Sequence, residues 1–204
     1  MDSSIAPPLL LHGLATRVRQ EGMDAFAKRI DEHTIQFVRI LPGPIERIWA
    51  YLWDGKKRGE WFHGGPMPTK PGESFDLYCK HSSLSPNQAP PPEKFVEMDR
   101  TGHHSSNVLL SYEPPHRLVF ALGPEGRENS EVEFVLSQEG DPKDDKVRFT
   151  LSHRKIPDRE YAVEVSGGWH AYLEILQYKA EGKTPPAFWD VWRQTEGVYE
   201  KRYP

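Results

Sequence analysis

The chain has 204 residues, a net charge of -4 and one cysteine, Cys79, and its six Trp, eight Tyr and nine Phe predict a packed interior rather than a disordered chain. A pI near 6.1 without a basic block makes nucleic acid and anionic membranes poor partners. A single cysteine can form neither an intramolecular disulfide nor a cysteine-cluster metal site, and it suits a reducing, cytoplasmic location. No segment approaches the roughly 20 apolar residues that span a bilayer.

The first third of the chain predicts an extension, a strand and two helices. We expect residues 1–32 to form an N-terminal extension that holds at most one short helix. Residues 34–41 are rich in β-branched and aromatic side chains and predict a strand, which the Pro-Gly-Pro sequence at 42–44 ends. The last of these prolines suits the first turn of a helix, and apolar residues at helical spacing continue that helix to Trp53. A second short helix is expected over residues 56–62.

The middle of the chain predicts a meander of antiparallel strands. Residues 75–79 predict one strand, and the proline-rich segment that follows over residues 81–93 is expected to lack regular structure. Four more segments carry β-branched or aromatic residues between turn sequences, namely residues 105–112, 117–122, 131–137 and 147–154. Residues 95–98 could add part of another strand.

The end of the chain predicts two helices. Residues 161–181 carry an apolar stripe at helical spacing, most regular from Gly168 onward, and Gly182 is a typical C-terminal stop. Residues 187–199 predict a last helix, whose aromatic side chains we expect to pack on the domain itself. This order of elements predicts an α+β fold in which a curved antiparallel sheet of six to seven strands surrounds the long helix.

Several short motifs identify a relationship. They are the strand, proline break and helix of residues 39–49, Trp61, the turn at 71–75, the Pro-Pro turn within 113–120, and Gly167-Gly168-Trp169. Together they resemble the START-like (SRPBCC) superfamily, and within it the proteins similar to the C-terminal domain of the activator of heat-shock protein 90 ATPase. The resemblance covers residues 33–182, leaves residues 183–204 as a C-terminal helical extension, and implies a helix-grip fold. Because this superfamily holds ligand carriers, cyclases and co-chaperone domains, function has to be argued from a site.

A curved sheet and a helix often enclose a cavity. We expect apolar side chains from both to form its walls, although every one of them would also serve a filled core. The candidates are Trp49, Phe75, Leu77, Leu110, Tyr112, Phe120, Phe134, Phe149, Leu151, Trp169, Tyr172 and Leu176.

Titratable residues give weaker signals. Of nine histidines, His103, His104, His153 and His170 could converge near the start of the long helix, but no metal motif is present, and surface or hydrogen-bonded roles are the simpler interpretation. We therefore expect no metal and no cofactor. Gly167 and Gly168 are expected to let the chain pass close to the sheet where the helix begins.

The acidic and nucleophilic residues mark no catalytic group. Arg39 and Arg154 need an anionic partner if they point inward. The acids are scattered without a paired spacing, and any of them could act as a general acid if buried: Glu46, Asp54, Glu60, Glu97 and Asp99. Neither Ser105, Ser106 nor Cys79 has the sequence context of a catalytic triad.

Three functions remain open. The first is a binding module that holds a hydrophobic or amphipathic small molecule between the sheet and the long helix. The second is a protein-interaction or stress-response module of the co-chaperone kind, with a chaperone or a second copy of the chain as partner. The third is a cyclase or hydrolase that acts on an aromatic compound in the cavity, which requires a buried ionisable group on the cavity wall.

Overall fold

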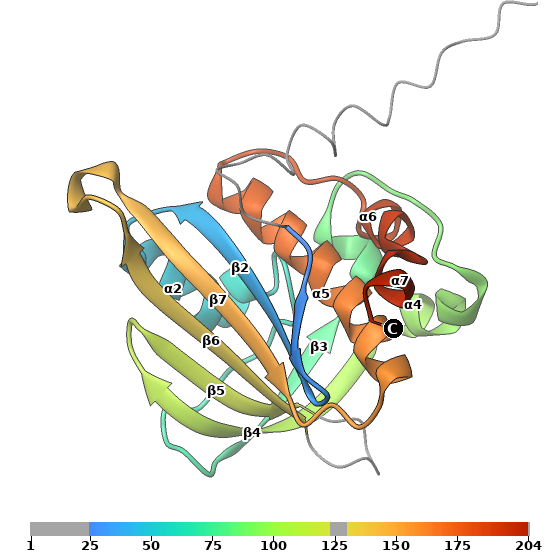
Figure 1. Cartoon of the computed structure of the whole chain (residues 1–204), viewed down its shortest axis with the longest axis horizontal. Helices are drawn as coiled ribbons and strands as arrows, with labels where there is room; N and C mark the ends of the chain where they lie inside the picture. The colour runs from blue at the N-terminus through green and yellow to red at the C-terminus, as the bar shows by residue number, and fades with distance from the viewer. Residues whose placement is uncertain (1–24, 123–129, 204) are drawn as a thin grey trace, which may run out of the picture.

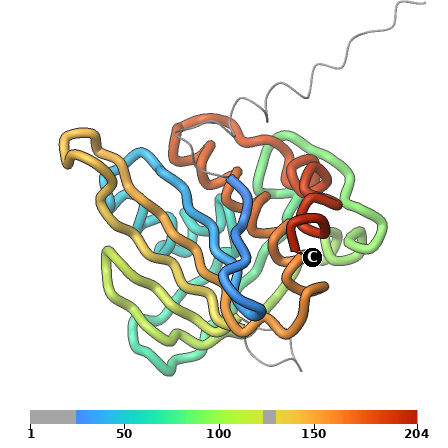
Figure 2. The backbone as a smooth tube through the Cα atoms, in the orientation of Figure 1, coloured from blue at the N-terminus to red at the C-terminus, as the bar shows by residue number. Residues whose placement is uncertain are grey.

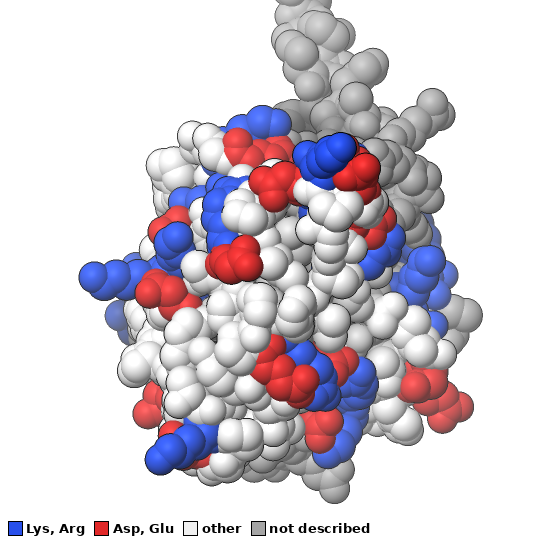
Figure 3. Space-filling view, turned by 90° about the vertical axis from the view of Figure 1, so that its left-hand side faces the viewer, with Lys and Arg blue, Asp and Glu red and all other residues white. Residues whose placement is uncertain are grey.

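The computed structural model describes residues 25–122 and 130–203 (Figure 1). Most of the N-terminal stretch in which a short helix was expected therefore lies outside the described residues. Among the described residues, no helix combines the length and the apolar character that a membrane span requires. On the face shown in Figure 3, acidic and basic side chains are interspersed rather than segregated by sign.

Seven antiparallel strands form one sheet, in the order β1-β2-β7-β6-β5-β4-β3. This confirms the predicted α+β helix-grip architecture. The strands are β1 (Lys28–Asp31), β2 (Thr34–Pro42), β3 (Ser74–Cys79), β4 (His103–Glu113), β5 (Arg117–Leu122), β6 (Ser130–Glu139) and β7 (Lys146–Arg154). Strand β1 lies in the stretch expected to be an extension, and it pairs with β2 at the edge of the sheet.

Alternation of side chains gives the sheet its apolar inner face. In β2, every second residue from Ile35 to Leu41 is buried, as a strand with one covered face requires. The register carries this face across the sheet, because Phe37 lies opposite Leu151 and Leu151 lies opposite Phe134. Phe134 packs in turn against Phe149 at 5.5 Å between ring centroids.

A register shift between Leu109 and Ser111 interrupts the alternation in β4. Before the shift the buried residues have odd numbers, and Leu109 is fully buried. Leu110 has an even number and points outward, 40% exposed, whereas the extra residue reverses the parity beyond it, so that Tyr112 packs against the core. Leu110, expected on a cavity wall, therefore lies on the surface.

The helices cover the inner face of the sheet and one end of it. They are α2 (Ile45–Trp53), α3 (Gly55–Arg58), α4 (Val96–Thr101), α5 (Arg159–Ala180), α6 (Phe188–Thr195) and α7 (Val198–Arg202), with short 3-10 turns η1 (His81–Leu84), η2 (Glu93–Phe95) and η3 (Pro142–Asp144). Figure 1 shows α5 lying along the sheet, with α4, α6 and α7 gathered beside it. Helix α2 is joined to the end of α5 by Arg47, whose Nη1 donates to Ala180 O at 2.9 Å.

Helix α5 begins at Arg159, where the Asp158 carboxylate accepts the Tyr161 amide hydrogen at 2.8 Å. Gly167 and Gly168 therefore lie well inside the helix, so the expectation that they mark its entry close to the sheet is wrong. A Cβ atom at Gly167 would lie 3.1 Å from Trp192 Nε1, whereas one at Gly168 would meet nothing within 4 Å. The first glycine lets α6 approach α5, and the second faces open space.

The proline-rich segment forms a layer of its own beside α6. It contains η1 and the first residue of η2, so the expectation that residues 81–93 lack regular structure is wrong in part, and α4 follows it, so the partial strand expected over residues 95–98 is instead helical. The backbone of this segment is tied to the chain beyond α5, because Ser85 Oγ donates to Pro185 O at 2.7 Å and Asn87 Nδ2 donates to the same oxygen at 2.8 Å. Figure 2 shows these two stretches, far apart in sequence, running side by side.

The C-terminal aromatic side chains are buried within the chain itself, as the sequence favoured. The single helix expected over residues 187–199 is two helices, α6 and α7, because Gly197 between them has a φ of 69° that a right-handed helix does not accommodate. Trp189 and Tyr199 are among the largest fully buried side chains. The Tyr199 hydroxyl also accepts the Ala27 amide hydrogen at 3.2 Å and thereby joins the two ends of the described chain.

Candidate functional site

A pocket of about 430 Å³ lies between the open end of the sheet, α5, α6 and the proline-rich segment. Its walls are mainly aromatic and apolar, with four histidines among them. The lining residues are Phe62, His63, His81, Phe95, Met98, His103, Ser105, Leu122, His153, Tyr161, Glu164, Val165, Gly168, Trp169, Tyr172, Phe188, Trp189 and Trp192. Its volume falls in the range of roughly 300–1,000 Å³ typical of small-molecule sites.

His63 reaches the pocket from the loop after α3, and Arg58 fixes that loop. The Arg58 side chain is completely buried and donates to the backbone oxygens of His63 at 2.8 Å, Trp53 at 2.9 Å and Gly65. Burial lowers the pKa of Arg58 to about 10, which leaves the guanidinium charged at neutral pH. A buried cation thus holds the loop through carbonyl groups, and the His63 ring stacks on Phe62 at 4.4 Å.

His81 reaches the pocket from the first residue of η1. The Asp99 carboxylate accepts the Ser82 amide hydrogen at 2.9 Å, which fixes this turn from α4. The His81 ring packs between Phe188 at 4.5 Å and Trp189 at 5.0 Å between ring centroids. The orientation of His81 therefore depends on both α4 and α6.

The Tyr172 hydroxyl, one α5 turn from Gly168, joins these two histidines. It lies 3.0 Å from His63 Nε2 and 2.6 Å from His81 Nε2, and it interacts electrostatically with the Cys79 thiol. Burial lowers the pKa of His63 well below its usual value and that of His81 to about 4, so both rings are neutral at pH 7. Burial also raises the pKa of Tyr172 well above its usual value and that of Cys79 to about 12.

The single proton on the Tyr172 hydroxyl limits the tautomers of the two rings. The hydroxyl can donate to at most one of the two Nε2 atoms and accepts from at least one of them, because both rings are neutral. At least one Nδ1 is therefore an acceptor. Within the described part of the chain, neither His63 Nδ1 nor His81 Nδ1 has a hydrogen-bond partner, although both atoms are buried.

Trp189 adds a third buried nitrogen without a partner, its indole Nε1. An unpaired buried donor or acceptor costs about 1–3 kcal/mol. The pocket therefore has apolar walls, and three of its lining residues, His63, His81 and Trp189, each carry a buried nitrogen without a hydrogen-bond partner among the described residues.

In a second polar part of the pocket wall, around His153, the hydrogen bonds are made within the protein itself. Trp169 Nε1 donates to His153 Nδ1 at 3.0 Å, which places the remaining proton of the neutral ring on Nε2, where it is donated to Ser130 Oγ at 2.7 Å. Ser130 Oγ in turn donates a hydrogen bond to Leu122 O at 2.6 Å. Burial lowers the pKa of His153 to about 3, so this chain of hydrogen bonds contains a neutral imidazole.

Two of the expected cavity-wall residues, Trp169 and Tyr172, line the pocket. Leu110 is exposed, and Tyr112 is half-buried beside Trp49, at 5.7 Å between ring centroids. The other candidates are buried in the core: Trp49, Phe75, Leu77, Phe120, Phe134, Phe149, Leu151 and Leu176. These side chains therefore fill much of the space between sheet and helix, and the pocket lies at one end of it.

The histidines singled out from the sequence lie in three different surroundings. His103 and His153 line the pocket, whereas His104 is exposed. His170 lies on the far side of α5, with Nδ1 2.9 Å from the Tyr199 hydroxyl.

The two arginines singled out from the sequence also lie in different surroundings. Arg39 is buried, donates to Val38 O at 3.0 Å and lies over the Phe37 ring. Arg154 forms a salt bridge with Glu133.

The acidic candidates for acid–base chemistry do not line the pocket. Glu46 and Glu60 are exposed, Asp54 caps α3, and Glu97 pairs with Arg100 at 2.6 Å. Asp99 is buried and serves to hold η1. Among the described residues, Glu164 is the one acidic side chain of the pocket wall, and no sequence pattern had singled it out.

Sequence reasoning also missed His63 and His81. His63 lies in a glycine-rich loop and His81 opens a segment judged irregular, so neither belongs to a periodic pattern. The spacing of Cys79 and His81, two apart at the end of a strand, was the one available signal, since alternate strand residues share a face. Nothing in the sequence indicated that Tyr172 would join them.

A curved antiparallel sheet that grips a long C-terminal helix over a pocket at one end defines the START-like class of domains. A family model described as Activator of Hsp90 ATPase homolog 1-like protein matches residues 42–180, more than half of the chain. The chain belongs to this family.

Solved structures agree with this assignment. A Bordetella parapertussis protein solved by NMR is 40% identical, with 88% of this chain and 91% of that chain covered and a TM-score of 0.73. CalU16 from Micromonospora echinospora is 22% identical, with 87% and 94% covered and a TM-score of 0.61. A Mesorhizobium loti protein is 18% identical, with 72% and 96% covered and a TM-score of 0.54, and these last two likenesses show the fold alone. A comparison with curated proteins gave no match.

Proposed function

We propose that the protein binds an apolar or amphipathic small molecule, with aromatic character and at least one hydrogen-bonding group, in the pocket between the sheet and α5. The observation that carries this proposal is the coincidence of aromatic walls with three unpartnered buried nitrogens, on His63, His81 and Trp189. Aromatic walls supply apolar contact, and the few polar atoms fix the orientation of the bound molecule.

The hydrogen-bonding pattern narrows the chemistry of the ligand. At least one of the two histidine Nδ1 atoms is an acceptor, and Trp189 Nε1 can only donate. A hydroxyl group, which both donates and accepts, complements the two histidines, and a carbonyl oxygen complements Trp189. A purely aliphatic molecule would leave all three nitrogens unpaired, so hydroxylated or carbonyl-bearing aromatic compounds fit the pocket better.

Gly168 allows the proposal to be tested without disturbing the core. It lines the pocket, and a Cβ placed there has no neighbour within 4 Å, so Gly168→Leu extends its side chain into the free volume. Gly168→Ala is the matched control, because it makes the same change of helix propensity but adds only a methyl group.

The measurements are native mass spectrometry of the protein purified under mild conditions and thermal shifts with a panel of hydroxylated aromatic compounds and fatty acids. A ligand at 100 times its Kd should stabilise the wild type and Gly168→Ala by about 2.7 kcal/mol, and Gly168→Leu much less. If no compound shifts the wild type, or if Gly168→Leu responds as fully as Gly168→Ala, the pocket is not the binding site.

Catalysis is a second candidate because of one observation, the Tyr172 hydroxyl held between two neutral histidines at the pocket wall. Such an arrangement can transfer a proton to or from a bound aromatic compound. Tyr172→Phe keeps the ring and removes the hydroxyl. A binding protein would retain its ligand in this variant, whereas an enzyme would retain binding and lose turnover of that ligand.

A co-chaperone role is suggested only by the name of the family, which refers to activation of the Hsp90 ATPase. It is tested by measuring the ATPase rate of Hsp90 with and without the purified chain. An unchanged rate at saturating chain concentration would remove this hypothesis and leave the binding proposal untouched.

A further inference from the structure

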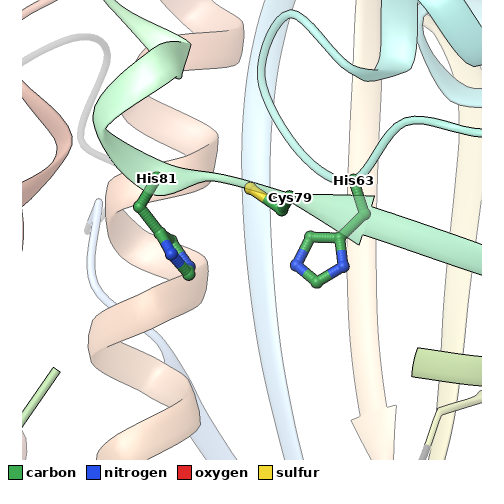
Figure 4. Close-up of side chains that lie close together, drawn as sticks. All are labelled: His63, Cys79 and His81. Atoms are coloured by element: carbon green, nitrogen blue, oxygen red, sulfur yellow. The ribbon is translucent and has the colours of Figure 1, made fainter. Parts of the chain in front are cut away.

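Three buried side chains of the metal-ligand type meet beside the pocket: His63, Cys79 and His81. One ligand atom from each lies within 4.8 Å of the other two. They come from separate segments, since His63 follows α3, Cys79 ends β3 and His81 begins η1. Figure 4 shows the two imidazole rings on either side of Cys79. Two imidazole nitrogens and a thiolate form a donor set that suits borderline-soft divalent ions such as Zn²⁺.

We propose that His63, Cys79 and His81 bind one zinc-type divalent ion, with the Tyr172 hydroxyl at the fourth position. No ligand of the ion comes from the molecule that the pocket holds, although both sites use His63 and His81. The metal–sulfur bond forms as the Cys79 thiol loses its proton to solvent, and Tyr172 binds as a neutral hydroxyl.

The distances are close to those of a tetrahedral site. Zn–N and Zn–S bonds of about 2.0–2.3 Å place neighbouring ligand atoms roughly 3.3–3.8 Å apart. The Tyr172 oxygen already lies 3.0 Å from His63 Nε2 and 2.6 Å from His81 Nε2. The three ligand atoms of His63, Cys79 and His81 lie within 4.8 Å of one another, so they would have to approach by at most about 1 Å to reach these separations.

The surroundings hold the ligands in place, as an effective metal site requires. The Arg58 side chain fixes the backbone of His63, and Asp99 fixes the turn that carries His81 through the Ser82 amide. Asp99 also interacts electrostatically with Cys79 and His81, which favours a cation between them. Because His63 and His81 line the pocket, an ion can reach the cluster from solvent through it.

A metal-free role is the competing explanation. The Tyr172 hydroxyl has one proton and two lone pairs, so it can satisfy two histidine nitrogens and the thiol by itself. The two explanations differ in one measurable consequence: only the metal site forms a bond between an added ion and Cys79.

Cobalt gives a direct readout of that bond, because Cys79 is the only cysteine in the chain. The tag-free, full-length protein is treated with a chelator, and Co²⁺ and then Zn²⁺ are titrated in. We expect one ion per chain, a thiolate-to-cobalt charge-transfer band, loss of that band as Zn²⁺ displaces Co²⁺, and protection of Cys79 from alkylation by Zn²⁺.

Variants assign the ligands. Cys79→Ser should abolish the cobalt band, and Cys79→Ser and His81→Gln should each weaken Zn²⁺ binding by about 100-fold or more. His104→Gln is the control, because His104 is an exposed histidine on β4 whose ring packs on Tyr78 at 4.6 Å. Gly168→Leu, which fills the pocket, should keep the cobalt band at equilibrium. The metal-site proposal can therefore be refuted without refuting the small-molecule proposal, and the reverse.

The wild-type spectrum decides the question even if a variant does not fold. A wild-type protein with no charge-transfer band, or with Zn²⁺ affinity that Cys79→Ser and His104→Gln reduce equally, would overturn the proposal and assign the cluster to Tyr172 alone. Retention of tight Zn²⁺ binding in a folded Cys79→Ser variant would overturn it as well, since the ion would then lie elsewhere.

Discussion

Adjacent glycines in α5 should respond in opposite directions to the same substitution. At Gly168 an added Cβ meets no atom within 4 Å, so Gly168→Ala should gain the full helix-propensity difference of about 1 kcal/mol. At Gly167 the added atom would lie 3.1 Å from Trp192 Nε1 and 3.2 Å from Thr195 Oγ1, both in α6. Overpacking of this kind costs about 1–3 kcal/mol, which cancels or exceeds the propensity gain.

Thermal and urea unfolding of the two variants measure this difference. For a chain of this size a change of 1 kcal/mol moves Tm by about 2–4 °C, so Gly168→Ala should melt that much above the wild type and Gly167→Ala should melt at or below it. Equal stabilisation by both substitutions would refute the close packing of α6 on Gly167. Destabilisation by Gly168→Ala would refute the open space beside Gly168, and with it one wall of the pocket.

Three further results are expected. Arg58→Met keeps the aliphatic stem but removes the donors to His63 O, Trp53 O and Gly65 O. It should lower the free energy of unfolding, measured by urea titration, by about 3 kcal/mol or more. A loss below about 1 kcal/mol would contradict the anchoring role of Arg58. The stability advantage of the wild type over His153→Gln should be constant above pH 6.5 and should shrink by up to about 1.4 kcal/mol per pH unit toward pH 3. The reason is that in this pH window the unfolded chain binds a proton at His153, whereas the folded chain, in which the pKa of His153 is about 3, does not. A stability difference that does not change with pH would contradict this reasoning. Gly197→Ala should lower Tm by an amount equivalent to about 1–2 kcal/mol, because its φ of 69° is unfavourable for alanine, and an unchanged Tm would show that the turn between α6 and α7 relaxes freely.

The architecture followed from the sequence because its signals were local. Alternation over residues 34–41 and the proline at Pro44 placed β2 and α2, and the apolar stripe with Gly182 placed α5. Errors arose where one residue changed the outcome. The extra residue near Leu110 in β4 reversed the parity of the strand, and Gly197 divided one expected helix into two.

The pocket could be predicted only in part. Trp169 and Tyr172 were found because the stripe of a helix identifies which side chains face the sheet. His63 and His81 were not, because their position depends on a buried arginine and on hydrogen bonds between segments about 100 residues apart. Periodicity describes one element at a time, whereas this wall is assembled from several.

Part of the pocket is shaped by the chain beyond the family match. The family match ends at residue 180, yet α6 contributes Phe188, Trp189 and Trp192 to the lining, and Trp189 supplies one of the unpartnered nitrogens. The proline-rich segment, which contributes His81, is held against the chain beyond α5 through Pro185. A relative that shares the sheet and α5 but differs in these two segments would have the same fold around a different pocket, so the specificity of this protein has to be determined from its own α6 and η1.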